Sequence, residues 1–222
     1  MPENKARLGE RILNTLRYWL RDHDEFFVRD PQRPLPACRI RPLQDADFEA
    51  CEEIYRLNEA AHFPPDFFGE FQEFFRSKKA YVLVAEVEGA IRGFGGISIH
   101  PHHAIQAAGL SFGMVHPDFR KQGFGTALLL ARLASLPTPR KVWIVMMSSA
   151  GGSATFYARF GFSYARDYID PGSSLEFSQF YVKLRSGDRI ECRHILEKAS
   201  IVLESDSSHI PDFTPEAIAE PG

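Results

Sequence analysis

The 222-residue chain has few cysteines and no long apolar run. Its three cysteines, Cys38, Cys51 and Cys192, lie far apart and form no CxxC pair, so neither a disulfide framework nor a cysteine zinc site is suggested. No uninterrupted apolar stretch approaches the roughly 20 residues that a membrane-spanning helix needs, and the N-terminus is charged rather than signal-like. We therefore expect a cytoplasmic protein with no membrane partner and no metal.

The chain also lacks a strong net charge, because 26 basic residues face 29 acidic ones. A formal charge of −3 gives no long-range field that would attract a polyanion, so nucleic acid is not an expected partner. The apolar content is 44%, and 19 phenylalanines supply material for one well-buried core. Any phosphate binding must therefore be local.

The segment order predicts one α/β domain with extensions at both ends. Residues 1–36 combine an amphipathic helix over 7–27 with a proline-rich linker, and residues 187–222 read as a partly disordered C-terminal extension with a short helix over 195–205. Between them, residues 37–186 form the main domain. Its strands are expected at 38–41, 80–89, 91–100, 109–115, 141–149, 163–169 and 174–184, and its helices begin at Asp45 or cover 67–75, 126–136 and 153–160.

Six phenylalanines give the segment HFPPDFFGEFQEFF an unusual aromatic content. Phe67, Phe71, Phe74 and Phe75 have helical spacing, which predicts a helix that packs on the core. A second interpretation is a lid that lines a pocket for an apolar acceptor, because exposed aromatic clusters often mark binding surfaces.

The stretch HPDFRKQGFGTAL places two glycines and two basic residues between an expected strand and an expected helix. The first backbone N–H groups of a helix have no partner within it and lie at the positive end of its dipole, so such a turn can bind phosphate. Gly123 and Gly125 would allow close approach of an anion, and Arg120 and Lys121 add positive charge. A purely structural turn is the alternative. The dinucleotide and P-loop patterns both fail here.

The longer string VHPDFRKQGFGTAL resembles the acyl-CoA-binding signature of the GNAT superfamily of N-acetyltransferases, with Val115, Pro117, Arg120, Gly123 and Gly125 in register. Downstream, SATFYARFGF is similar to the second motif of that family. The residues that match the second motif are Phe156, Tyr157, Gly161 and Phe162.

The resemblance implies a GNAT fold, with a mixed, mostly antiparallel twisted sheet of about six to seven strands and about four helices, besides an extra N-terminal helix. It also implies transfer of an acetyl group from acetyl-CoA to a primary amine by a monomer or homodimer. Tyr157 would hydrogen-bond or protonate the CoA sulfur. The CoA-binding residues implied by the resemblance are Met114 and Val115 at the pantetheine arm and Arg120, Lys121, Gln122, Gly123, Phe124, Gly125 and Thr126 around the pyrophosphate.

The general base is not assigned by this resemblance. Val145 stands where the branch that acetylates ribosomal proteins has a glutamate, and Ala150 stands where the family has an asparagine. A histidine could accept the amine proton instead, as could water. The candidate histidines are His100, His102 and His103, which also read as a solvated loop and form only a weak metal pattern, and His116.

Two other classes of function are compatible with the sequence. A non-catalytic, regulatory acyl-CoA-binding module would explain the missing glutamate at Val145, whereas Tyr157 and the intact turn argue against it. An interaction protein built on the N-terminal helix rests only on the amphipathic pattern from Leu8 to Leu20.

Overall fold

The computed structural model describes residue 26 and residues 34–63, 67–76, 80–102, 105–137, 142–149, 153–169 and 176–211. The helix predicted over residues 7–27 falls outside these ranges apart from Phe26, as do Ala150 and the last eleven positions of the chain. Phe26 belongs to the hydrophobic core, and its ring stacks on that of Phe160 with a centroid distance of 6.4 Å.

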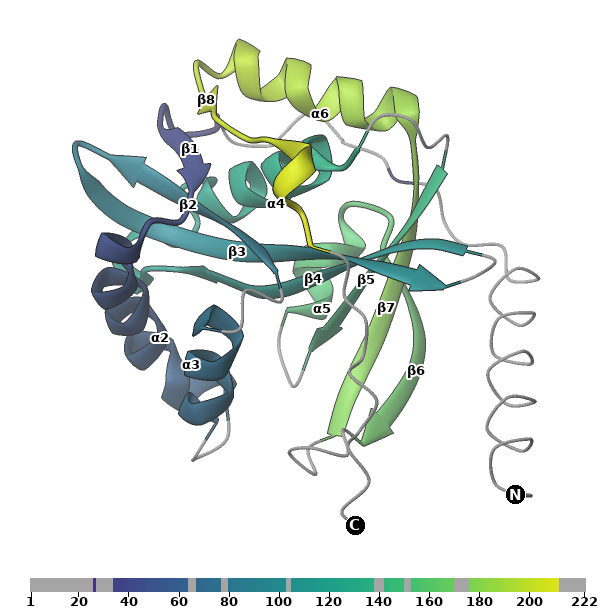
Figure 1. Ribbon diagram of the computed structural model, residues 1–222, viewed down its shortest axis with the longest axis horizontal. Coiled ribbons are helices and arrows are strands. Elements are labelled where there is room, and N and C mark those ends of the chain that lie inside the picture. The colour runs from purple at the N-terminus through teal and green to yellow at the C-terminus, as the bar shows by residue number, and fades with distance from the viewer. Residues whose placement is uncertain are drawn as a thin grey trace.

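A single sheet of eight described strands forms the centre of the fold (Figure 1). Its order is β6-β7-β5-β4-β3-β2-β1-β8, and its neighbours pair antiparallel except β4 with β5 and β1 with β8. The prediction of a mixed, mostly antiparallel sheet is confirmed. The strands are β1 Arg39–Pro42, β2 Tyr81–Val87, β3 Ala90–His102, β4 Ile105–Val115, β5 Val142–Ser149, β6 Ser163–Ile169, β7 Glu176–Arg185 and β8 Val202–Leu203.

Helices cover both faces of the sheet (Figure 1). One face carries α2 (Phe48–His62) and α3 (Phe68–Arg76), and the other carries α4 (Phe124–Ser135) and α6 (Ser186–Lys198). The short α5 (Ala154–Ala158) follows β5. Because successive strand residues point to opposite faces, Val82 and Val84 pack with α2 and α3, while Leu83 and Ala85 pack with the core under α4.

The helix predicted over residues 195–205 is wrong in its bounds. α6 begins at Ser186 and ends at Lys198, and Ser200 then adopts a left-handed conformation with φ of 58°. The apolar residues that follow form β8, which pairs in parallel with β1 through Val202 and Leu203. Two β-branched residues, Ile201 and Val202, fit an extended strand better than a helix.

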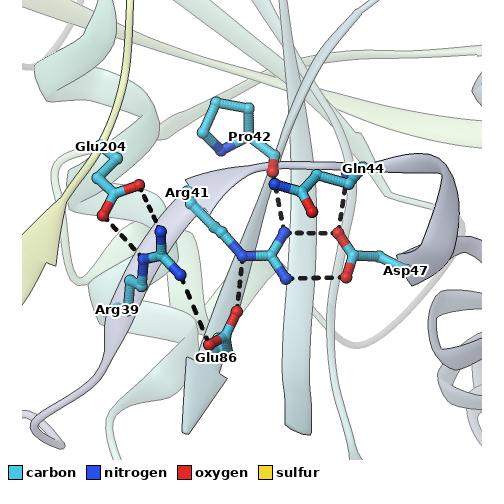
Figure 2. A network of polar contacts seen from close by, with 7 residues as sticks. All are labelled: Arg39, Arg41, Pro42, Gln44, Asp47, Glu86 and Glu204. Carbon is cyan, nitrogen blue, oxygen red and sulfur yellow. Dashed lines mark hydrogen bonds and ion pairs between the residues drawn. The ribbon is translucent and has the colours of Figure 1, made fainter. Parts of the chain in front are cut away.

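A buried arginine ties β1 to the elements on either side of it (Figure 2). Arg41 donates from Nη1 and Nη2 to the two carboxylate oxygens of Asp47, at 2.6 and 2.9 Å, and from Nε to Glu86 at 2.6 Å. The side chains of Arg41 and Asp47 are only 8% and 9% exposed. The hydrogen bonds from Arg41 hold the pKa of Asp47 below its usual value, so both groups stay charged.

Replacing Arg41 with methionine should leave the Asp47 carboxylate buried without its cation and lower the free energy of unfolding by about 3 kcal/mol at pH 7. The matched control is Arg39→Met, two residues away on the same strand, where the ion pair with Glu204 is nearly half exposed and a much smaller loss is expected. Urea denaturation measures both. Equal losses in the two variants would contradict the assignment.

The effect of Arg41→Met should also depend on pH. Because the folded-state pKa of Asp47 is lowered, the stabilisation by the pair is complete above the ordinary carboxyl pKa and disappears as the pH falls through the lowered value. The difference between wild type and variant should therefore shrink below about pH 4. A difference that stays constant between pH 7 and pH 3 would show that Asp47 does not contribute through its charge.

Candidate active site

The site begins where β4 and β5 separate. The two strands pair in parallel only from Ala107–Ile144 to Leu110–Met147, although both continue further. Residues 111–115 of β4 and 148–149 of β5 then line a cavity of about 690 Å³. The separation therefore exposes backbone groups of both strands inside the sheet.

A bulge in β4 accompanies this separation. Phe112 and Gly113 together oppose the single residue Gly95 of β3, and Phe112 has a positive φ of 43°. A Cβ atom on Gly113 would lie 3.1 Å from the guanidinium of Arg132 and 3.3 Å from the hydroxyl of Tyr157. The absence of a side chain at Gly113 thus lets both groups approach the backbone of the bulge.

The phenol of Tyr157 therefore lies beside the point where the sheet opens. Tyr157 belongs to α5, is 7% exposed and lines the cavity. Its ring packs edge-on against Phe156 and Phe162, at centroid distances of 5.0 and 5.2 Å. Gly161 ends this turn with φ of 83°, as the sequence predicted.

The glycine-rich turn leads directly into α4. Gly123 is the N-cap with φ of 95°, in the left-handed region that favours glycine, and a Cβ there would lie 2.9 Å from Pro36. Gly125 has normal backbone geometry, and its nearest neighbour, Phe156, would be 3.7 Å from an added Cβ. A Cβ at Gly125 would therefore make only ordinary van der Waals contacts, unlike one at Gly123.

The predicted CoA-binding residues lie in different settings. Met114, Val115 and Arg120 line the cavity. The side chains of Phe124 and Thr126 are buried, so these two residues can contribute only backbone groups there. Lys121 and Gln122 are exposed in the turn.

Asn58 joins this turn to β4, and sequence analysis missed it. Its side chain, 4% exposed, donates to the carbonyls of Ile54 at 2.7 Å and Val115 at 3.3 Å, and its Oδ1 accepts from Arg120. The residue falls on the buried stripe of α2 that includes Cys51 and Ile54. A lone asparagine on an apolar helical stripe was the available signal, because buried polar groups require partners.

The histidines considered as general bases lie in different parts of the structure. His100 lines the cavity, with its Nε2 3.2 Å from the Ser98 hydroxyl, whereas His116 caps the short helix at Pro117–Phe119. Val145 is fully buried in the core. The side chain of His102 and the whole of His103 fall outside the described residues.

The three cysteines are not candidates for the chemistry. All are buried, and burial raises the pKa of Cys38 to about 11 and raises the pKa values of Cys51 and Cys192 further. A thiol with so high a pKa carries almost no thiolate at neutral pH. Among the described residues there is no group of three or more metal-binding side chains, and none of the described helices is long and apolar enough to cross a membrane.

The four phenylalanines of the aromatic segment that have helical spacing do not share one face. Phe71 and Phe75 are buried against α2 and the sheet, whereas Phe67 and Phe74 line the cavity. Packing on the core is therefore confirmed for Phe71 and Phe75, whereas a lid for an apolar acceptor stays a prediction. Glu70, which sequence analysis did not consider, lies on the cavity side with Glu73.

Comparison with known proteins bears on this geometry. A family model described as an acetyltransferase (GNAT) domain matches residues 78–164, and no curated protein sequence matches the chain. A solved GNAT-family protein from Desulfovibrio desulfuricans is 18% identical, with a TM-score of 0.53 over 68% of this chain and 99% of that one. A structure named histone acetyltransferase HPA2 and related acetyltransferase, from Corynebacterium glutamicum, is 16% identical, with a TM-score of 0.51 over 65% of this chain and 95% of that one.

Both structural likenesses lie below 25% identity and show the fold alone. The family match covers β2 to the start of β6, which includes the bulge, the glycine-rich turn and Tyr157. The resemblance that the two sequence motifs suggested is thereby confirmed. Residues 78–164 of this chain therefore match the acetyltransferase domain model of the GNAT family.

Proposed function

We propose that this domain transfers an acetyl group from acetyl-CoA to a primary amine, without a covalent enzyme intermediate. The observation that carries the proposal is the position of Tyr157, whose hydroxyl lies at the β4 bulge inside the cavity. A hydroxyl there can protonate a thiolate that leaves from between β4 and β5. The buried cysteines argue against an acyl-thiol intermediate.

The cosubstrate would bind along the line from the cavity to α4. Backbone groups of Met114 and Val115 would hold the pantetheine arm between the strands. Residues 120–126, from Arg120 to Thr126, would hold the pyrophosphate at the positive end of the α4 dipole. The missing side chain at Gly125 and the cation of Arg120 at the cavity wall both support this placement.

The chemical step then requires an attacking amine, a proton donor for the departing sulfur and an acceptor for the amine proton. The amine nitrogen attacks the thioester carbonyl carbon, the C–S bond breaks, and the departing sulfur takes a proton from Tyr157. The amine must lose a proton before or during the attack, to His100 or through water. Tyr157 regains its proton from solvent after the product leaves.

Gly125→Glu should weaken acetyl-CoA binding at least about tenfold, because it places a carboxylate beside the pyrophosphate. This position tolerates a side chain, and glutamate suits the first turn of a helix, so the fold should persist. Gly123 would be a poorer choice, since its positive φ and its contact with Pro36 would strain any substitution. Isothermal calorimetry gives the affinity.

The control for Gly125→Glu is Gly125→Gln, which has nearly the same size and no charge. We expect the glutamine variant to retain most of the affinity. If the two variants bind acetyl-CoA equally, the loss is steric and the anion site is not at the start of α4. If both bind as the wild type does, the cosubstrate lies elsewhere.

Tyr157→Phe should lower kcat about 100-fold and change the dissociation constant of acetyl-CoA less than about threefold, because only the proton donor is removed. The assay follows thiol release with an accepted amine. Tyr164→Phe, which removes an exposed hydroxyl outside the cavity, is the control. Unchanged turnover in Tyr157→Phe would remove Tyr157 from the mechanism, whereas acetyl-CoA binding without turnover in the wild type would favour an acyl-CoA-binding module without catalysis.

A further inference from the structure

Six aromatic side chains surround the cavity on the side of α3. They come from α3, the loop between α2 and α3, and strands β4, β6 and β7, and each is partly exposed toward the cavity. The lining rings are Phe63, Phe67, Phe74, Phe112, Tyr168 and Phe177.

These rings contact one another across the cavity. The ring centroid of Phe67 lies 6.0 Å from that of Phe112 in the bulge and 6.4 Å from that of Phe177 in β7. The ring of Phe177 stacks on that of Tyr168 with a centroid distance of 5.8 Å. The chain of rings therefore extends from α3 to the far strands of the sheet. A folded protein surface could reach the bulge only by parting these rings, whereas a small molecule fits within the cavity of about 690 Å³.

Two polar side chains that line the cavity near the rings, Ser148 and Gln179, already have partners within the protein. Ser148 accepts a hydrogen bond from Tyr168 at 3.0 Å, and Gln179 accepts from Arg166 and Tyr181. An acceptor rich in hydroxyl groups would have to break these bonds and replace them. An apolar body would instead cover the exposed ring surfaces and gain about 25 cal/mol per Å² of apolar surface buried.

The charged side chains that line the cavity beside α3 are carboxylates. Phe67, Glu70 and Phe74 are spaced i, i+3 and i+7 on or next to α3 and therefore face one way, and Glu73 also lines the cavity. Arg120 is the arginine among the described residues that line the cavity. It donates a hydrogen bond to Asn58 at the opposite end of the cavity, near the glycine-rich turn. Carboxylates and aromatic faces both attract an ammonium group.

We propose that the acceptor is a small primary amine whose cationic head is attached to an apolar, ring-sized body. This inference rests on the acetyl transfer proposed above. Glu70 and Glu73 attract the ammonium form, and the six rings hold the body so that the amine reaches the thioester beside Tyr157. Sugar amines and protein amino termini are disfavoured by the paired polar groups and by the enclosing rings.

The test compares 2-phenylethylamine and hexylamine with ethanolamine, glucosamine and an alanine-initiated tripeptide, as acceptors for the full-length protein with acetyl-CoA. We expect kcat/KM for the two apolar amines to exceed that of the other three at least about tenfold. Preference for ethanolamine, glucosamine or the peptide would overturn the inference and leave acetyl transfer intact. Failure to acetylate any amine, with acetyl-CoA still bound, would overturn both.

The double variant Glu70→Gln/Glu73→Gln tests whether these two carboxylates attract the ammonium group of the acceptor. Its matched control is Glu53→Gln, at an exposed position of α2 outside the cavity. The double variant should raise KM for 2-phenylethylamine about tenfold and leave the acetyl-CoA dissociation constant unchanged, while the control changes neither. An unchanged KM in the double variant would contradict a role for these carboxylates. Phe67→Leu, which keeps an apolar side chain but removes the ring, should reduce the preference for 2-phenylethylamine over ethanolamine.

Discussion

The bulge in β4 is the constraint on which the rest of the site depends. Two residues, Phe112 and Gly113, occupy the space opposite Gly95, so β4 cannot stay paired with β5 beyond Leu110. Below the bulge, the 2%-exposed Arg132 donates to the carbonyls of Leu128 and Gly96. This buried cation fits only because neither Gly95 nor Gly113 carries a side chain.

The bulge also lies between two ends of the cavity that offer different chemical groups. On one side, Met114, Val115 and the turn before α4 offer backbone groups and positive charge, which suit a phosphorylated cosubstrate. On the other side, Phe112 packs on Phe74 of α3 and on Phe67, which in turn contacts a ring of β7, with carboxylates close by. Tyr157 lies at the boundary, where the thioester of one substrate would meet the amine of the other.

Sequence alone was sufficient for the parts whose signal is local. The strand-to-helix turn at Gly123, the left-handed Gly161 and the strand at β2 each depend on neighbouring residues and were predicted correctly. The bridge from Asn58 to Arg120 joins residues 62 positions apart, so no local pattern could show it. β8 is only two residues long and is defined by its partner β1.

The division of the aromatic cluster shows a further limit. Helical spacing places Phe67, Phe71, Phe74 and Phe75 near one another, but it cannot say which of them meet the core and which meet a cavity. That outcome depends on where the bulge places Phe112, which packs on Phe74 at 4.7 Å. Helical spacing likewise cannot show that Glu70 and Glu73 line a cavity.

Thermal unfolding of the purified protein, with and without acetyl-CoA, tests the central claim most directly. If the opening between β4 and β5 holds acetyl-CoA, a concentration 100 times the dissociation constant should stabilise the protein by about 2.7 kcal/mol and raise its melting temperature. Desulfo-CoA, which retains the pyrophosphate, should also raise it. No shift with either compound at millimolar concentration would contradict the account, because the turn before α4 would then be structural only.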